Sequence, residues 1–173
     1  MKRAFSILAA FIFLLAAGCE KQRIDETAPP APPTAFTSNL NVTFGDTKMT
    51  AKLSQNSPDS FEIQMLSPEI LNSLALSYAD GTCTVTYDGL KFETDLSRFP
   101  QAEFGALVTQ TLSDIAQDMN IQKTYSDGVW TYKGAGERGG FSLTQSGKTG
   151  AWLELTVDGA NLHVVFNDFI SNK

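Results

Sequence analysis

The sequence predicts an α+β fold made mainly of antiparallel β-strands, with a single long helix. Over most of the chain after Phe36, apolar residues alternate with polar ones, which is the pattern of strands with one buried and one solvent-facing side. Turn-forming pairs such as Asp80-Gly81 and Asp88-Gly89 separate these runs. Between Pro100 and Met119 the apolar residues instead fall at helical spacing.

The alternation predicts about ten strands, six before the helix and four after it. The apolar positions of the first six are Leu40, Val42 and Phe44; Met49, Ala51 and Leu53; Phe61, Ile63 and Met65; Leu74, Leu76 and Tyr78; Cys83, Val85 and Tyr87; Leu90 and Phe92. The last four span residues 129–133, 141–145, 151–157 and 162–166, with glycine-bearing turns between them.

Two segments interrupt the strands. A short helical turn is expected over about residues 67–72, with Ser67 as its cap and Pro68 at its first position. The helix of about residues 100–119 carries one apolar stripe, so it is expected to cover one face of the sheet. The stripe consists of Phe104, Leu107, Val108, Leu112, Ile115 and Met119.

The N-terminus has the organisation of a bacterial export signal. Lys2 and Arg3 precede a short apolar segment that ends in Leu15-Ala16-Ala17-Gly18-Cys19. A cysteine at this point resembles the lipobox of bacterial lipoproteins, which implies diacylglyceryl modification of Cys19 and cleavage before it. The alternative is an ordinary signal peptide that ends near a cysteine. A spanning helix is disfavoured, because the apolar segment is shorter than the roughly 20 residues that a bilayer needs.

These features divide the chain into three parts. Residues 1–18 are the signal peptide, residues 19–35 are the lipidated cysteine with a disordered proline-rich tether, and residues 36–173 are one β domain. The expected location is the extracytoplasmic face of the cell membrane, or the outer membrane if the organism has one. The lipid on Cys19 would provide the membrane attachment.

The charge of the chain argues against a nucleic-acid partner. Loss of Lys2 and Arg3 with the signal leaves 11 of the 13 basic side chains against 19 acidic ones, so the formal charge falls from −6 to −8. Phosphate backbones repel such a surface, so no nucleic-acid partner is expected.

With Cys19 lipidated, Cys83 has no cysteine to pair with, and its strand pattern predicts a buried apolar role.

The sequence predicts no enzyme, no cofactor and no metal site. The single histidine, His163, is expected on the solvent side of a strand, so a nucleophile would lack a base, and no Gly-x-Ser-x-Gly motif occurs. The acidic residues are scattered rather than clustered as metal ligands would be. The glycines of residues 134–140 precede a strand rather than a helix and lack the lysine of a phosphate-binding loop, so they indicate a flexible hairpin loop.

The order of these elements resembles the LolA/LolB-like superfamily. The segments that carry the resemblance are Phe61-Glu62-Ile63-Gln64-Met65-Leu66-Ser67-Pro68, Leu76-Ser77-Tyr78-Ala79-Asp80-Gly81 and Thr86-Tyr87-Asp88-Gly89. The resemblance covers about residues 36–169. It implies a curved, half-open antiparallel sheet with helices on its concave side and an apolar cavity for acyl chains. Some lipoproteins with this fold act through protein partners instead.

Two functions are therefore expected as alternatives. In the first, the protein binds a lipid or another hydrophobic ligand on the concave face. The candidate ligand-binding residues are Phe61, Ile63, Met65, Leu74, Leu76, Val85 and Phe92, which would otherwise form a packed core. In the second, the protein is a non-enzymatic envelope interaction module with a filled core, and Trp130 and Trp152 are either exposed contact residues or packed in the sheet. A subunit of an envelope-assembly or export apparatus is a third alternative.

Overall fold

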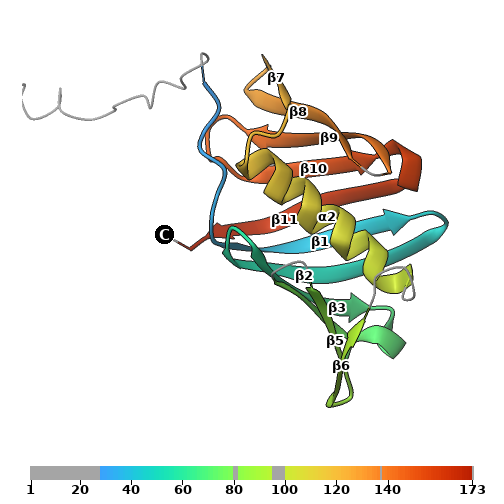
Figure 1. Ribbon diagram of the computed structural model, residues 1–173. Helices are drawn as coiled ribbons and strands as arrows, with labels where there is room; N and C mark the ends of the chain where they lie inside the picture. The colour runs from blue at the N-terminus through green and yellow to red at the C-terminus, as the bar shows by residue number, and fades with distance from the viewer. Residues whose placement is uncertain (1–27, 80–81, 95–99, 137, 173) are drawn as a thin grey trace, which may run out of the picture.

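The computed structural model describes residues 28–79, 82–94, 100–136 and 138–172. The described chain forms one eleven-stranded antiparallel sheet, crossed by helix α2 (Pro100–Ala116) on one face (Figure 1). The strands are β1 (Phe36–Phe44), β2 (Thr47–Ser57), β3 (Ser60–Ser67), β4 (Ala75–Ala79), β5 (Thr82–Tyr87), β6 (Leu90–Thr94), β7 (Gln122–Ser126), β8 (Val129–Gly136), β9 (Gly139–Ser146), β10 (Trp152–Val157) and β11 (Leu162–Ser171). Two short 3-10 helices, η1 (Glu69–Leu71) and η3 (Asp158–Ala160), complete the fold.

The strand order is β6-β5-β4-β3-β2-β1-β11-β10-β9-β8-β7. The first and last strands therefore pair in the middle of the sheet, with Leu40 opposite Phe166 and Val42 opposite Val164. The edge strands are β6 and β7, and α2 is the connection between them. The helix crosses the concave face because its chain must travel from one edge of the sheet to the other (Figure 1).

The period-two pattern produces strands with one buried side. In β3, for example, Phe61, Ile63 and Met65 are buried, whereas Glu62 is exposed. The predicted mainly antiparallel fold is confirmed, and the sheet has one strand more than the ten expected. The additional strand is β7, whose sequence QKTYS is exposed at four of five positions and so has no apolar alternation to reveal it.

Turn chemistry matches the pairing of the strands. Asp88 and Gly89 both have positive φ angles, 48° and 81°, as the predicted two-residue hairpin between β5 and β6 requires. Asp127 and Gly128 have φ angles of 54° and 82° and form the equivalent turn between β7 and β8. The other predicted hairpin pair, Asp80-Gly81, lies outside the described residues.

Helix α2 ends earlier than its apolar pattern predicts. Asp118 takes a positive φ of 54°, and its N–H bonds to the carbonyl of Ile115, while the N–H of Met119 bonds to the carbonyl of Asp114. These two bonds form a Schellman motif, which stops the helix at Ala116. The predicted helix is therefore present, but it ends three residues before the expected position of about 119. Met119 is 57% exposed rather than part of the buried stripe.

The predicted helical turn after β3 is present but shorter, as η1. No side chain caps it. The expected cap, Ser67, instead accepts hydrogen bonds at its Oγ from the backbone N–H and the hydroxyl of Thr50, at 3.0 and 2.9 Å. Ser67 therefore stabilises the pairing of β2 with β3 rather than the start of η1.

The described part of the tether, residues 28–34, forms no helix or strand. Its four prolines, Pro29, Pro30, Pro32 and Pro33, are half-buried. A methyl group on Gly150 would lie 3.6 Å from Pro30 Cβ, so this segment lies beside the turn between β9 and β10. Within the described ranges, no helix has the length and apolar character needed to cross a bilayer.

Candidate binding pocket

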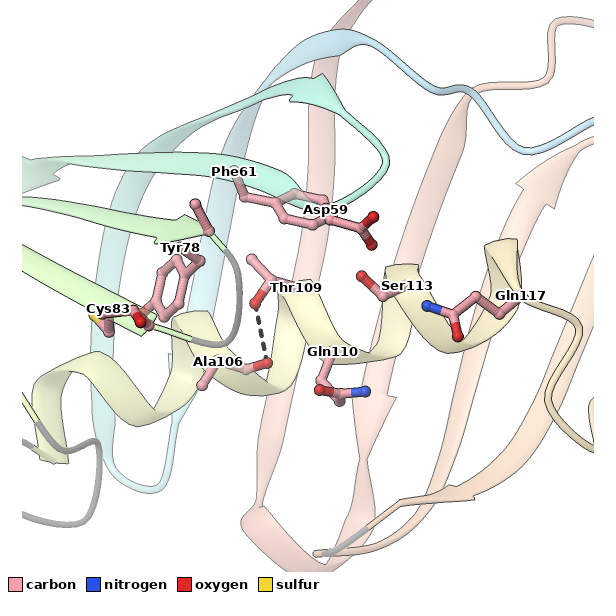
Figure 2. A pocket seen from close by; sticks show the side chains of 11 residues that line it. Asp59, Phe61, Tyr78, Cys83, Ala106, Thr109, Gln110, Ser113 and Gln117 are labelled. Carbon is pink, nitrogen blue, oxygen red and sulfur yellow. Dashed lines mark hydrogen bonds between the residues drawn. The ribbon is translucent and has the colours of Figure 1, made fainter.

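A pocket lies between helix α2 and the half of the sheet formed by β3, β4 and β5 (Figure 2). Its volume is about 340 Å³. The lining residues are Asp59 from the β2–β3 turn, Phe61 from β3, Tyr78 and Ala79 from β4, Thr82 and Cys83 from β5, and Ala106, Thr109, Gln110, Ser113 and Gln117 along and just beyond α2.

The helix side of the pocket is mostly polar. Thr109, Gln110, Ser113 and Gln117 follow one another at spacings of one, three and four residues, so they lie along one side of α2, next to its buried apolar stripe. The hydroxyl of Thr109 donates to the carbonyl of Ala106 at 3.2 Å, and the Gln110 amide donates to Asp114 at 2.7 Å. The Gln110 amide is thereby held at the helix surface.

The sheet side is mostly apolar. The Phe61 ring and the Tyr78 ring form its wall, and Tyr78 stands opposite Cys83 across the β4–β5 pair. The Tyr78 hydroxyl is directed away from bulk solvent and donates a hydrogen bond to the carbonyl of Ala102 at 2.7 Å. This bond ties β4 to the first turn of α2.

Burial controls the ionisation of this wall. Desolvation, reinforced by the nearby Cys83 thiol, raises the pKa of Tyr78 far above its ordinary value. Burial also raises the pKa of Cys83, and the hydrogen bond with Tyr78 opposes that rise only in part. Both groups are therefore neutral at physiological pH, and the buried Cys83 behaves as the small apolar residue that its strand pattern predicts.

Helix and sheet approach each other closely beside Tyr78, one of the residues that line the pocket. Gly105 of α2 lies against Tyr78 and Ile63: a Cβ at this position would overlap the Tyr78 hydroxyl and lie 3.0 Å from Ile63 Cδ1. A glycine here lets the helix backbone approach the sheet to a distance that any side chain would prevent. Gly105 is therefore a point of close contact between α2 and the sheet, next in the chain to Ala106 of the pocket lining.

The walls of the pocket offer several kinds of hydrogen-bonding group. The described lining residues supply hydroxyls, amides, the Cys83 thiol and the carboxylate of Asp59, which is exposed. His163 lies on the opposite face of the sheet, half-exposed on β11, where its Nε2 contacts the Glu154 carboxylate. Among the described residues, no group of three or more potential metal ligands occurs.

The predicted ligand-binding residues separate into three sets. Phe61 lines the pocket. Phe92 is 46% exposed on edge strand β6. The remaining five are buried in the core that packs beneath α2: Ile63, Met65, Leu74, Leu76 and Val85. Their alternation identified the buried side of the sheet, but only the position of the helix determines which of them border an open volume.

The polar lining of α2 was missed in the sequence. The signal that would have found it is the run of polar residues at positions 109, 110, 113 and 117, directly beside the apolar stripe. Asp59, in contrast, belongs to a turn and has no pattern that relates it to the helix.

The other candidate residues are also located. Trp130 and Trp152 are buried, as the packing alternative predicts, and their rings contact Tyr125 and Tyr132, respectively. The glycines of residues 134–140 belong to the hairpin of β8 and β9, with Gly136 opposite Gly139. Cys19 lies outside the described residues.

The fold is that of an open, curved antiparallel sheet with a helix across its concave face. The chain is similar in structure to an uncharacterized conserved protein from Thermus thermophilus, with a TM-score of 0.52 and 8% identity over 82% of this chain and 80% of that one. It also aligns with a LolA superfamily protein from Nitrosomonas europaea, with a TM-score of 0.40 and 10% identity over 90% of this chain and 95% of that one.

No protein-family model matches the chain, and no curated protein sequence matches it. The likeness to the Thermus thermophilus protein shows a shared fold alone, because the sequences are only 8% identical. Lipid anchoring and ligand binding remain predictions.

Proposed function

We propose that this protein is a lipid-anchored extracytoplasmic binding protein that holds one single-chain amphiphile in the pocket between α2 and strands β3–β5. The observation that carries the proposal is the two-sided lining of the pocket. The Phe61 and Tyr78 rings offer an apolar wall, while Gln110 and Ser113 offer amide and hydroxyl groups on the facing helix. An amphiphile satisfies both sides, and the proposed role involves no catalytic step.

The size of the pocket limits the ligand. Ligand sites are typically about 300–1,000 Å³, and a cavity of roughly 150 Å³ holds a benzene molecule. A volume of about 340 Å³ therefore suits about twelve non-hydrogen atoms, which is a medium-length acyl chain or the end of a longer one. A lipid with two long chains exceeds this volume.

The position of the pocket supports a ligand that comes from the membrane. Phe36, where the tether joins β1, is paired with Gln55 near the end of β2, and Asp59 lies in the turn that follows. The tether and the β2–β3 turn, which contributes Asp59 to the pocket, are therefore at the same end of the sheet (Figure 1). The chain from Cys19 to Ala28 spans at most about 30 Å, which would keep that end close to the bilayer.

A specific observation favours the second candidate function, an interaction module without a ligand. Five of the seven predicted ligand residues are packed in the core beneath α2 rather than around an open cavity. If the pocket holds only water, the protein would act through its surface on another envelope protein.

The test is binding of a fluorescent fatty-acid analogue with a twelve-carbon chain to the unlipidated chain from Glu20 onward, which needs no detergent. Ala106→Phe places a phenyl ring in the pocket and is expected to weaken binding by about tenfold or more. Ala116→Phe is the matched control, because the same substitution lies on the same helix at an exposed position outside the lining, and it should leave binding unchanged.

Mass spectrometry of organic extracts from the purified chain gives an independent measurement. A co-purifying single-chain amphiphile, lost in Ala106→Phe, is the expected result. The ligand proposal is refuted if no amphiphile co-purifies and the probe binds both variants and the parent chain equally weakly. Such a result would leave the interaction module as the better account.

A further inference from the structure

The two edges of the sheet differ in chemical character. Edge strand β7 exposes the polar residues Gln122, Lys123 and Thr124. Edge strand β6 exposes apolar residues: Leu90 is 71% and Phe92 46% exposed, and Tyr87 on the neighbouring β5 is also exposed. In the described part of the chain, β6 pairs with β5 alone. Lys91 and Glu93 are exposed as well, so β6 is an edge strand with one apolar and one charged side. An edge strand with one partner is a template for pairing with another strand.

The hairpin geometry determines which backbone groups of β6 face outward. The positive φ angles of Asp88 and Gly89 define a two-residue turn, so Tyr87 and Leu90 exchange hydrogen bonds directly. Because hydrogen-bonded and non-hydrogen-bonded pairs alternate along an antiparallel ladder, Phe92 also bonds inward to β5. The N–H and C=O groups of Lys91 and Glu93 then face away from the sheet.

We propose that β6 is a self-association edge, at which two copies of this chain pair their β6 strands in antiparallel orientation about a two-fold axis at Phe92. In this register Lys91 of the first copy lies opposite Glu93 of the second, and by symmetry Glu93 of the first lies opposite Lys91 of the second. Both residues of each pair have outward-facing backbone groups, so they exchange hydrogen bonds across the new interface. The two sheets join into one continuous sheet.

Charge selects this register over its neighbours. A shift of two residues in one direction places Lys91 opposite Lys91 of the second copy, and the opposite shift places Glu93 opposite Glu93. Directly opposed like charges destabilise a strand pair, whereas opposite charges stabilise it. The same register brings the Phe92 rings of the two copies together on the concave side, where Phe92 and Leu90 are exposed.

The segment is short, because β6 has five residues. Pairing through one short strand is weak in dilute solution, and confinement of the chains to a membrane surface raises their effective concentration. The inference itself does not depend on the proposed ligand, because the pocket lining includes no residue of β6.

The test uses two differently tagged copies of the full chain, co-expressed and then co-purified, with self-association measured on the purified chains bound to lipid vesicles, where confinement raises their effective concentration. The parent copies are expected to associate. Lys91→Glu alone places two carboxylates opposite each other at both charge pairs of the dimer, and it is expected to weaken self-association by about tenfold or more. Glu93→Lys alone should do the same through opposed ammonium groups. Both positions are exposed, so the variants should melt at the temperature of the parent.

The decisive sample mixes the two single variants. In the mixed dimer, one copy presents a carboxylate at both positions and the other presents an ammonium group at both, so each opposed pair again has opposite charges. Association should return to the parental level, while each variant alone stays weak. A copy that carries both changes should also self-associate. The proposal is overturned if the parent chain stays monomeric, if the single variants associate as tightly as the parent, or if mixing them restores nothing.

Discussion

Gly105 offers a direct test of the close approach between α2 and the sheet. In an exposed helix, replacing glycine by alanine stabilises by about 1 kcal/mol, because alanine restricts the unfolded chain and is the better helix former. At this position the added methyl would overlap the Tyr78 hydroxyl and lie 3.0 Å from both Tyr78 Cζ and Ile63 Cδ1. Helix propensity therefore predicts that Gly105→Ala raises the free energy of unfolding, whereas packing predicts that it lowers it.

The expected loss of stability combines two costs at Tyr78, overpacking and a broken hydrogen bond. Overpacking a core costs about 1–3 kcal/mol. Moving the ring also breaks the 2.7 Å hydrogen bond to the Ala102 carbonyl, and an unsatisfied buried hydroxyl costs about 1–3 kcal/mol. After subtracting the gain in helix propensity, Gly105→Ala should lower the free energy of unfolding by about 3 kcal/mol. For a domain of this size, the melting temperature should fall by about 6–12 °C.

A double-mutant cycle with Tyr78→Phe supplies the control. Phenylalanine lacks the oxygen that lies nearest the added methyl group, so Gly105→Ala should cost less, by about 1 kcal/mol or more, in the Tyr78→Phe background. Urea unfolding of the parent, the two single variants and the double variant gives the four free energies of unfolding that the cycle compares. The reasoning is refuted if Gly105→Ala raises stability, or if the two substitutions are additive.

Three further predictions concern other parts of the chain. Cys19→Ser should abolish labelling by a clickable fatty acid and membrane sedimentation in a carbonate wash while the domain still folds; persistent labelling would exclude Cys19 as the anchor. Burial raises the pKa of Tyr132 to about 12 from 10.0, so its contribution to stability is complete below about pH 10 and is lost as the pH rises through about 12. The Tyr132→Phe variant should therefore lose less stability than the parent between about pH 9 and pH 11.5 in urea titrations. Equal losses would show that ionisation of Tyr132 does not cause the decline. Gly159→Ala should destabilise by about 2 kcal/mol, because its methyl would overlap the Arg138 carbonyl, whereas Gly136→Ala, with open space around it, should change little in a thermal melt.

The sequence alone determined most of the strands and the helix, because both depend on local periodicity. The alternation of Phe61, Ile63 and Met65 is sufficient to predict which side of β3 is buried. Strand β7 was missed because an edge strand that exposes both sides needs no apolar alternation. Its turn, Asp127-Gly128, has the same signal as Asp88-Gly89 and would have located the hairpin of β7 and β8.

Only the tertiary structure decided which residues on the buried side of the sheet line the pocket. Periodicity states that a side chain faces the interior, but the position of α2 decides what lies opposite it. Ile63 and Leu76 lie in the packed core, whereas Phe61 on the same side of the sheet borders the pocket. Phe92 has the same alternation as these residues and yet is exposed, because its strand forms the edge of the sheet. The pairing of β1 with β11, and the meeting of Asp59 with the polar side of α2, join residues distant in sequence, and no local pattern encodes such contacts.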